Sequence, residues 1–403
     1  MLHKATQPRD IMCLLAILTL VLTRPAAAQT ANRVGPVANY SSAYDDNVLG
    51  VPDSETTTQV GARSDHVRTL QVGVQLQKSI GRQLLSADLR ASEVKYDRFA
   101  LLDYQGHDAK AEWKWQAGNR LRGTASVKYQ RTLMSFDDYH ILERRLQSER
   151  AKHIEARWQA HSRWELVAAG AEGEISYDTE LLRGRSRRER FVNVGVDYVT
   201  PLVDTAGVLV RRTVGTYPLS PELAVFPLAD EFEQGEVRFH ADWQAAGKLH
   251  FHTDGGYVSR RHKTADVRNF HGANARLDAR WALTGKSVLN ASLWRELGVV
   301  DDVVAYSVNR GASLRYSLSI SSKLRSDLDM SYENRNFPRT PASALGNSEG
   351  DTLRKATWAT EYEYAKYWQL RASVFRMLKN GHGSVTSFSR NGGAITLQYQ
   401  FSP

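Results

Sequence analysis

Near the end of the chain, apolar and polar side chains alternate from Ile395 to Phe401. One face of the expected strand carries Ile395, Leu397, Tyr399 and Phe401, and the other carries Thr396, Gln398 and Gln400. Such a strand suits a membrane if the apolar face is outside and the polar face is inside. In hydrocarbon every backbone group must be paired within the protein, so strands of about 9–11 residues cross only as a closed barrel. The rest of the chain must therefore repeat this pattern.

The first 28 residues have the features of a cleaved export signal. Lys4 and Arg9 precede a short apolar run at 11–22, and three alanines at 26–28 offer a cleavage site before Gln29. We therefore predict a signal peptide at 1–28 and a single barrel domain at 29–403. The one cysteine, Cys13, lies in the signal, so the mature chain is expected to form no disulfide.

The bulk composition narrows the class of protein further. No other stretch approaches 18 apolar residues, which excludes a helical membrane protein. The chain has a formal net charge of +9 and 24% charged residues, which suits a barrel with long loops and a wet interior. Positive charge favours anionic partners where it clusters. Nucleic acid is not expected as a partner, because export separates the chain from it.

Period-two alternation recurs along the mature chain and predicts an all-β fold, a transmembrane up-and-down antiparallel β-barrel of about 18 strands. A missed or split hairpin would change the count to 16 or 20. Short and long connections alternate, as expected for tight periplasmic turns and larger outer loops. The expected strands are 34–44, 67–79, 84–96, 106–117, 120–132, 149–160, 164–177, 190–200, 206–216, 233–245, 248–259, 270–282, 287–297, 306–318, 323–334, 354–364, 369–378 and 389–401.

Most tryptophans fall close to the expected short turns, where an interfacial aromatic girdle would lie. A soluble β-sandwich would show the same alternation with its faces exchanged. The export signal, the alternation of turn lengths and the aromatic terminal strand together favour the barrel in the outer membrane. The seven tryptophans are Trp113, Trp115, Trp158, Trp164, Trp243, Trp281 and Trp368.

The faces assigned to the lumen carry charges of both signs. Such walls hold water and suit sugars or ions rather than an apolar ligand. Cross-strand ion pairs that satisfy a wet interior would explain the same residues. The lumen candidates are Arg238, Arg276, Arg280, Arg325, Asp327 and Asp329.

The densest basic run lies in an expected outer loop and contains Arg183, Arg185, Arg187 and Arg188. Guanidinium groups bind phosphates and carboxylates in a bidentate manner. The run is therefore a candidate contact for the phosphates of lipopolysaccharide or for an acidic polymer, and Arg144-Arg145 and residues 260–263 add to it. A merely solvated loop explains the run equally well.

No pattern indicates a metal, a cofactor or catalysis. The pairs Asp45-Asp46, Asp137-Asp138 and Asp301-Asp302 fall in expected loops but show no fixed ligand spacing. His382-Gly383-Ser384 is the one match to a His-x-Ser pair, and it lies in an expected flexible loop. We therefore expect neither a metal site nor a cofactor, and we do not expect an enzyme.

Tyr44, Asp45, Asp46 and Asn47 follow the first expected strand. With a whole-chain barrel of this length, this segment resembles the EpsL-like outer-membrane proteins associated with exopolysaccharide biosynthesis operons, a branch of the β-barrel porins. The resemblance implies a channel or assembly component for an exported polysaccharide, acting with periplasmic export machinery among outer-membrane lipid and lipopolysaccharide. A general porin for small polar solutes and a surface-barrel hydrolase remain as alternatives.

Overall fold

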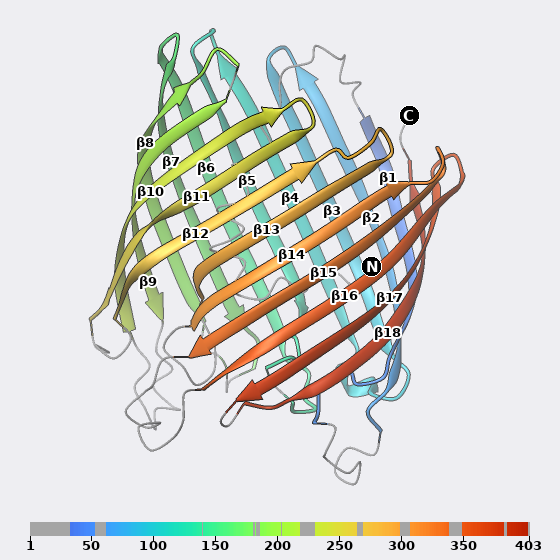
Figure 1. Cartoon of the computed structure of the whole chain (residues 1–403). Coiled ribbons are helices and arrows are strands. Elements are labelled where there is room, and N and C mark those ends of the chain that lie inside the picture. The colour runs from blue at the N-terminus through green and yellow to red at the C-terminus, as the bar shows by residue number, and fades with distance from the viewer. Residues whose placement is uncertain are drawn as a thin grey trace.

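The chain folds into one closed β-barrel whose strands are steeply inclined (Figure 1). The computed structural model describes residues 33–52, 62–138, 140–179, 182, 186–202, 204–217, 230–263, 269–298, 307–337, 349–382 and 385–401. The predicted signal at 1–28 lies outside these residues. Within them, no helix has the length and apolar character needed to cross a membrane.

Eighteen strands form a single antiparallel sheet, which confirms the predicted fold class and strand number. They are β1 (Arg33–Asp45), β2 (Asp65–Ile80), β3 (Gln83–Tyr96), β4 (Tyr104–Ala117), β5 (Leu121–Leu133), β6 (Leu146–His161), β7 (Trp164–Tyr177), β8 (Arg187–Val199), β9 (Thr205–Tyr217), β10 (Asp230–Ala246), β11 (Leu249–His262), β12 (Phe270–Trp281), β13 (Ser287–Gly298), β14 (Ser307–Ser319), β15 (Leu324–Phe337), β16 (Glu349–Ala365), β17 (Trp368–His382) and β18 (Phe388–Gln400).

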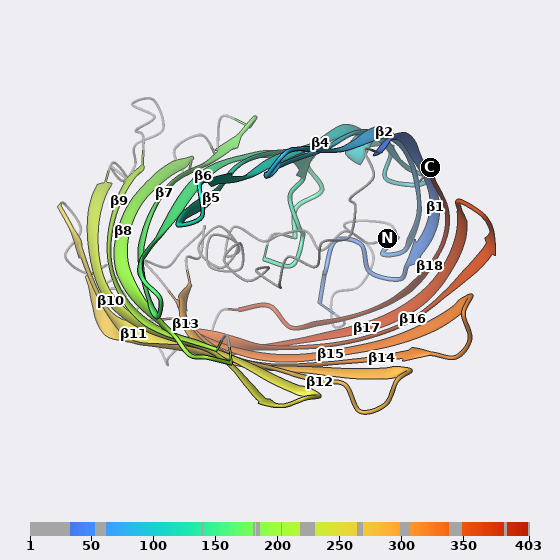
Figure 2. The same ribbon diagram turned by 90° about the horizontal axis from the view of Figure 1, so that it is seen from above.

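Each strand pairs with the next along the chain, and the first and last strands close the ring. In this closing seam, β1 pairs with β18 from Val37↔Gln400 to Asp45↔Gly392. Seen from above, the ring is elongated rather than circular (Figure 2). Closure leaves no unpaired sheet edge, which is the condition for placing strands in a membrane.

The strands alternate between an apolar outward face and a polar inward face, as predicted. On the terminal strand, Ile395 is 61% exposed on the outside, whereas Thr396 is buried on the inside. On β8, Val192, Val194 and Val196 are likewise exposed outward. Because exposed valines and leucines on a barrel face the lipid, these positions form an apolar belt around the wall.

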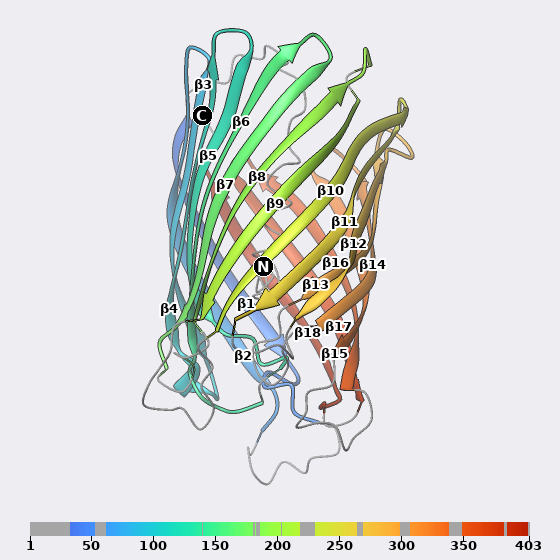
Figure 3. The same ribbon diagram turned by 90° about the vertical axis from the view of Figure 1, so that its left-hand side faces the viewer.

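The short connections lie at one end of the barrel, called here the turn end, and the long connections lie at the other, the loop end. Figure 3 shows the inclined strands of β3–β11 running between them. At the turn end, Gly118 has a φ of +63° in the tight connection between β4 and β5, a conformation that glycine adopts without strain. Six of the seven tryptophans predicted for an aromatic girdle are exposed outward there, and Trp115 is half-buried; the six are Trp113, Trp158, Trp164, Trp243, Trp281 and Trp368.

Several strands are longer at the loop end than the sequence predicts. The largest differences are at β16, which begins at Glu349 rather than 354, and at β17, which ends at His382 rather than 378. β8 begins at Arg187 rather than 190. Beyond the apolar belt the hairpins continue with charged outward residues such as Arg188 and Arg190, so the apolar alternation that marks a strand disappears before the strand ends.

A small apolar cluster, called here the mouth cluster, packs connections together at the loop end. It joins Val48, Leu49 and Val51 after β1 to Phe99 and Leu102 between β3 and β4 and to Leu133, Phe136 and Leu146 around the β5–β6 connection. Leu102 ends a short 3₁₀ helix, η1 (Ala100–Leu102), which the sequence pattern did not reveal. The cluster ties three outer connections into one packed unit.

Candidate functional site

The lumen wall is charged, and the six residues predicted to face the lumen all lie on inward positions of their strands. On β10, for example, Arg238 alternates with the outward Val237 and Phe239. On β15, Asp327 and Asp329 alternate with the outward Leu328 and Met330. The remaining three, Arg276, Arg280 and Arg325, follow the same alternation.

Much of the wall charge is neutralised within the wall. Arg238 donates to Glu236 on its own strand at 2.9 Å and to Asp254 on β11 at 2.9 Å. Arg157 repeats this geometry, with Glu155 on its own strand at 2.6 Å and Asp197 on β8 at 2.7 Å. A guanidinium shared by two carboxylates satisfies charges that would otherwise be costly to bury. These groups hold the wall together.

In two wall pairs the cation is much more exposed to the interior than its anion. The Lys110 side chain is 58% exposed, whereas its partner Asp108 is 12% exposed. Arg325 is 54% exposed and Asp327 is 9% exposed. Both pairs lie on inward faces, so solvent reaches the interior of the barrel. At these two pairs the group presented to the solvent is the cation.

A segment from one side of the barrel enters the lumen and binds the other side. This lumen segment, residues 134–145, connects β5 and β6, and Figure 2 shows it as a teal loop inside the ring. Asp138 accepts hydrogen bonds from Arg335 on β15 at 2.8 and 3.2 Å and from Lys379 on β17 at 3.0 Å. Asp137 accepts one from Arg390 on β18 at 3.0 Å.

These anchors lie on strands distant from the segment's own, and Arg335 on β15 lies nearly opposite them. Around the closed ring, β15 is eight strands from β5, and no two strands of eighteen are more than nine apart. Arg335 and Lys379 are buried, and both are also paired with the buried Asp351 on β16. The segment therefore supplies carboxylates that complete a buried cationic site on the far wall.

His140 provides a further anchor. Its Nδ1 lies 3.1 Å from the carbonyl oxygen of Leu49, and because a carbonyl only accepts, Nδ1 carries the proton. The ring also packs edge-on against Phe388. Burial lowers the pKa of His140 from its usual 6.5, and nearby Lys379 adds to this, although the Leu49 contact and the two aspartates act in the opposite direction. The imidazole is neutral at pH 7.

The tetrapeptide Tyr44-Asp45-Asp46-Asn47 has a structural position at the closing seam. Asn47 is buried, and its amide donates to the carbonyl oxygens of Val51 and Ser389, both at 2.9 Å. Asp46 accepts from the backbone and side chain of Asn391, while Asp45 lies 3.6 Å from Arg390. Tyr44 is exposed outward against His66. These contacts hold the connection after β1 against β18.

The predicted basic loop is divided by the structure. Arg183 and Arg185 lie outside the described residues. Arg187 and Arg188 belong to β8 rather than to a loop and occupy opposite faces: Arg187 is buried inward near Glu189, and Arg188 points outward to Glu174. The strand continues past the end of the apolar alternation, which is why the sequence placed them in a connection.

The neighbouring basic groups are also partly internal. Arg145 pairs with Glu143 at 2.7 Å and is buried. Arg260 is fully buried against the ring of Phe232 and donates to Gln234 at 2.9 Å. The expectation that these residues add exposed positive charge to the basic run is therefore wrong for Arg145 and Arg260. Lys263 is exposed and paired with Glu231.

The expected Asp pairs are engaged with protein groups where they are described. Asp137 and Asp138 bind cations of the far wall, Asp45 and Asp46 bind the seam, and Asp301-Asp302 lies outside the described residues. No cluster of three or more His, Cys, Asp or Glu side chains suited to a metal occurs in the described part of the chain. His382 ends β17, and Gly383-Ser384 is not among the described residues.

Two features were missed by sequence reasoning. The inward path of the lumen segment depends on partners some 200 residues away, for which a single sequence gives no signal. The second is a set of charges on the outward faces of β6, β7 and β8. These charges continue the alternation of the belt residues, so extending the outward face beyond the belt would have shown them.

Comparison with known proteins supports the fold class. No protein-family model matches the sequence, and no curated protein matches it, so the resemblance to the EpsL-like proteins finds no support there. Among solved structures, OccK2 of Pseudomonas aeruginosa aligns with a TM-score of 0.51 at 11% identity, covering 92% of this chain and 98% of that one.

Two further solved structures align over most of the chain. A BenF-like porin from Pseudomonas fluorescens Pf-5 aligns with a TM-score of 0.49 at 10% identity, over 92% of this chain and 99% of that one. The outer membrane protein OpdK of Pseudomonas aeruginosa gives 0.49 at 10%, over 91% and 98%. The fold similarity to OccK2, the closed ring and the apolar belt identify the chain as an outer-membrane β-barrel of porin-like architecture.

Proposed function

We propose that this barrel is a passive, non-enzymatic channel for small polar solutes, with a preference for anions. The observation that carries this proposal is the exposure of the lumen charges. In the pairs Lys110–Asp108 and Arg325–Asp327 the cation reaches the solvent and the carboxylate stays in the wall. A passing anion meets the exposed donors first, and a passing cation must approach the recessed carboxylates.

The lumen segment supports a small solute over a polymer. It is fixed to the far wall through Arg335, Lys379 and Arg390, so a solute must pass beside it. A thick hydrated polymer is more strongly obstructed by such a crossing segment than a small molecule is. The role in exopolysaccharide export rests on the tetrapeptide resemblance alone and stays a prediction, together with the polysaccharide and export-machinery partners.

Ion selectivity in planar bilayers tests the proposal. With a salt gradient of KCl, the reversal potential should indicate preferred passage of chloride. In the double variant Lys110→Gln/Arg325→Gln this preference should fall toward zero, because the exposed cations are removed while Asp108 and Asp327 remain. The matched control is Lys128→Gln/Arg238→Gln, which removes two inward cations with 19% and 11% exposed side chains.

Two outcomes would contradict the proposal. A cation preference in the unaltered barrel would mean that the recessed carboxylates govern passage. A barrel that inserts but conducts no ions, with or without the lumen segment anchored, would mean that it is not a channel. Loss of polymer outside cells lacking the gene, with normal uptake of small solutes, would favour the export reading.

A further inference from the structure

The outward face of the barrel is charged where β6, β7 and β8 rise above the apolar belt. Arg150 and Lys152 share the outward face of β6 with Ile154 and Trp158, which are exposed belt and girdle residues. Glu172 and Glu174 occupy the outward face of β7, and Arg188 and Arg190 that of β8. We call these six residues the outer-wall cluster.

The sheet register arranges the cluster in two rows across the three strands. In one row Lys152 lies opposite Glu172, which lies opposite Arg190, with N–O distances of 3.4 and 2.6 Å. In the other row Glu174 lies between Arg150 and Arg188, at 4.0 and 2.9 Å. Each glutamate is therefore shared by two cations, and the cluster has more positive than negative groups.

The excess positive charge faces outward. The side chains of Arg150, Lys152, Arg188 and Arg190 are 60%, 69%, 47% and 63% exposed, whereas those of Glu172 and Glu174 are 27% and 25% exposed. The cations thus extend over the carboxylates. A guanidinium has five N–H donors, so one bound carboxylate leaves donors directed away from the barrel. These donors are suited to phosphate oxygens.

Three other outward ion pairs each join one cation to one carboxylate. Arg68 on β2 pairs with Asp97, and Lys95 on β3 pairs with Glu93. Arg212 on β9 pairs with Glu233. The outer-wall cluster differs from these because two carboxylates serve four cations.

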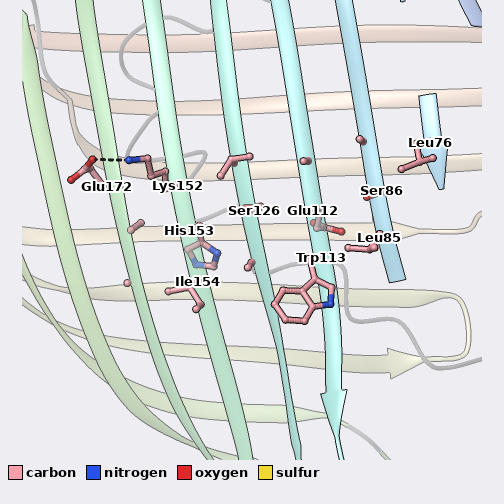
Figure 4. Close-up of a pocket in the computed structure, with 16 residues that line it drawn as sticks. Leu76, Leu85, Ser86, Glu112, Trp113, Ser126, Lys152, His153, Ile154 and Glu172 are labelled. Atoms are coloured by element: carbon pink, nitrogen blue, oxygen red, sulfur yellow. Dashed lines mark hydrogen bonds and ion pairs between the residues drawn. The ribbon is translucent and has the colours of Figure 1, made fainter. Parts of the chain in front are cut away.

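An apolar groove of about 620 Å³ lies on the same outer wall and begins at the cluster. Figure 4 shows the Lys152–Glu172 pair at one end of it, Leu76 at the other, and Ile154 and Trp113 along its lower side. The groove exists because outward positions on β3, β4 and β5 carry the small side chains of Ala87, Ala111 and Ala125 between larger neighbours. By the sheet register its lining residues form two adjacent rows across β2–β7, so the groove runs across the strands from the Lys152–Glu172 pair toward Leu76 and Leu85.

We propose that the outer-wall cluster and this groove together bind a phosphorylated glycolipid of the outer leaflet. The phosphates lie on the exposed cations, and one acyl chain lies in the groove. Neighbouring strands are about 4.8 Å apart, so cations on β6 and β8 are separated by roughly 10 Å, too far for one phosphate to engage fully. A headgroup with two or more phosphates matches this spacing. The site is independent of the channel function proposed above.

A lipid titration of the purified full-length barrel in an uncharged detergent tests this inference. The probe is a diphosphorylated lipid A-type glycolipid, and bound lipid is counted by native mass spectrometry. In the variant Lys152→Gln/Arg190→Gln, affinity should fall about tenfold or more, because charge-assisted hydrogen bonds to phosphate are lost. Binding to the unaltered barrel should also weaken as salt rises.

The matched control is Arg68→Gln/Lys95→Gln. It removes the same charge from the same outward face near the loop end, but from balanced pairs. The affinity of this control for the glycolipid should remain within about twofold of that of the unaltered barrel. A twofold change corresponds to roughly 0.4 kcal/mol of binding free energy. Equal losses in both double variants would show attraction by overall charge and overturn the proposal, as would no loss in either.

The groove is tested without changing any charge. Ala125→Leu fills the groove and should weaken glycolipid binding, whereas Ala275→Leu, at an outward position of β12 away from it, should not. The comparison of Ala125→Leu with Ala275→Leu still tests glycolipid binding if the charge variants do not assemble. Equal binding of the dephosphorylated glycolipid, or of phosphatidylglycerol, would show that multiple phosphates are not recognised and would contradict the proposal.

Discussion

The anchoring of the lumen segment can be tested by neutralising the two carboxylates that bind the far wall, in Asp137→Asn/Asp138→Asn. Asp138 is held by two hydrogen bonds from Arg335 and one from Lys379, and Asp137 by one from Arg390. The cations keep partial compensation, because Arg335 and Lys379 retain Asp351 and Arg390 retains Asp45. The variant therefore weakens the anchors without leaving an isolated buried charge.

The expected magnitude follows from these contacts. A hydrogen bond between charged groups contributes about 1.5–3 kcal/mol, and an asparagine oxygen preserves part of that. Asp138 is itself 34% exposed, which reduces its contribution through solvent screening. We expect the double variant to destabilise the anchored position by about 2–3 kcal/mol, which is a shift of roughly 30- to 150-fold in the ratio of anchored to released segment.

Single-channel recording in planar bilayers measures this shift. The variant should show larger conductance or frequent transitions to a larger level, while its heat-modifiable migration in SDS stays unchanged because no strand is altered. Glu143→Gln is the matched control, since this carboxylate belongs to the same segment but pairs with Arg145 inside it. Unchanged conductance in a correctly assembled Asp137→Asn/Asp138→Asn barrel would refute the idea that these anchors restrict passage.

Two further expectations concern pH and the lipid face. The folded-state pKa of His140 is lowered, so its contribution to holding the lumen segment is complete above the unfolded value near 6.5 and is lost as pH falls below it; conductance should rise on acidification, and His140→Phe should reduce this pH dependence. On β18, Leu397→Arg places a charge against lipid at a cost of up to about 2–4 kcal/mol, whereas Gln398→Arg faces the lumen and should be tolerated, as measured by urea-dependent folding into vesicles. Equal destabilisation by both arginines would contradict the assignment of faces.

The strand number was predictable from the sequence because membrane and lumen impose opposite chemistry on alternate residues. Val192, Val194 and Val196 show this directly on β8. The same reasoning failed at the loop end, where Arg188 and Arg190 are outward but above the belt, and the strand was cut short. The alternation of apolar and polar residues therefore predicts the limits of a strand only where its outward residues face lipid and are apolar.

For the candidate site, the sequence predicted which strand residues face the lumen but not the segment that enters it. The inward positions of Arg238 and Asp327 follow from alternation, but the lumen segment depends on Asp138 meeting Arg335 across the barrel, 197 residues later in the chain. Nothing local in the sequence around Asp137-Asp138 distinguishes a carboxylate that solvates a loop from one that anchors it. Asp138 and Arg335 come together only because all eighteen strands close into a ring.

The closing seam has a consequence for the order of assembly. Arg390 on β18 donates to the carbonyl oxygens of Asn47 and Val48, which belong to the seam, and to Asp137 of the lumen segment. The strand that closes the ring against β1 thus supplies one side chain that binds both the seam and the lumen segment. A chain that lacks β15–β18 has no Arg335, Lys379 or Arg390 to receive the segment. The lumen segment can therefore be anchored only when β15–β18 are in place, so the interior narrows when the ring is completed.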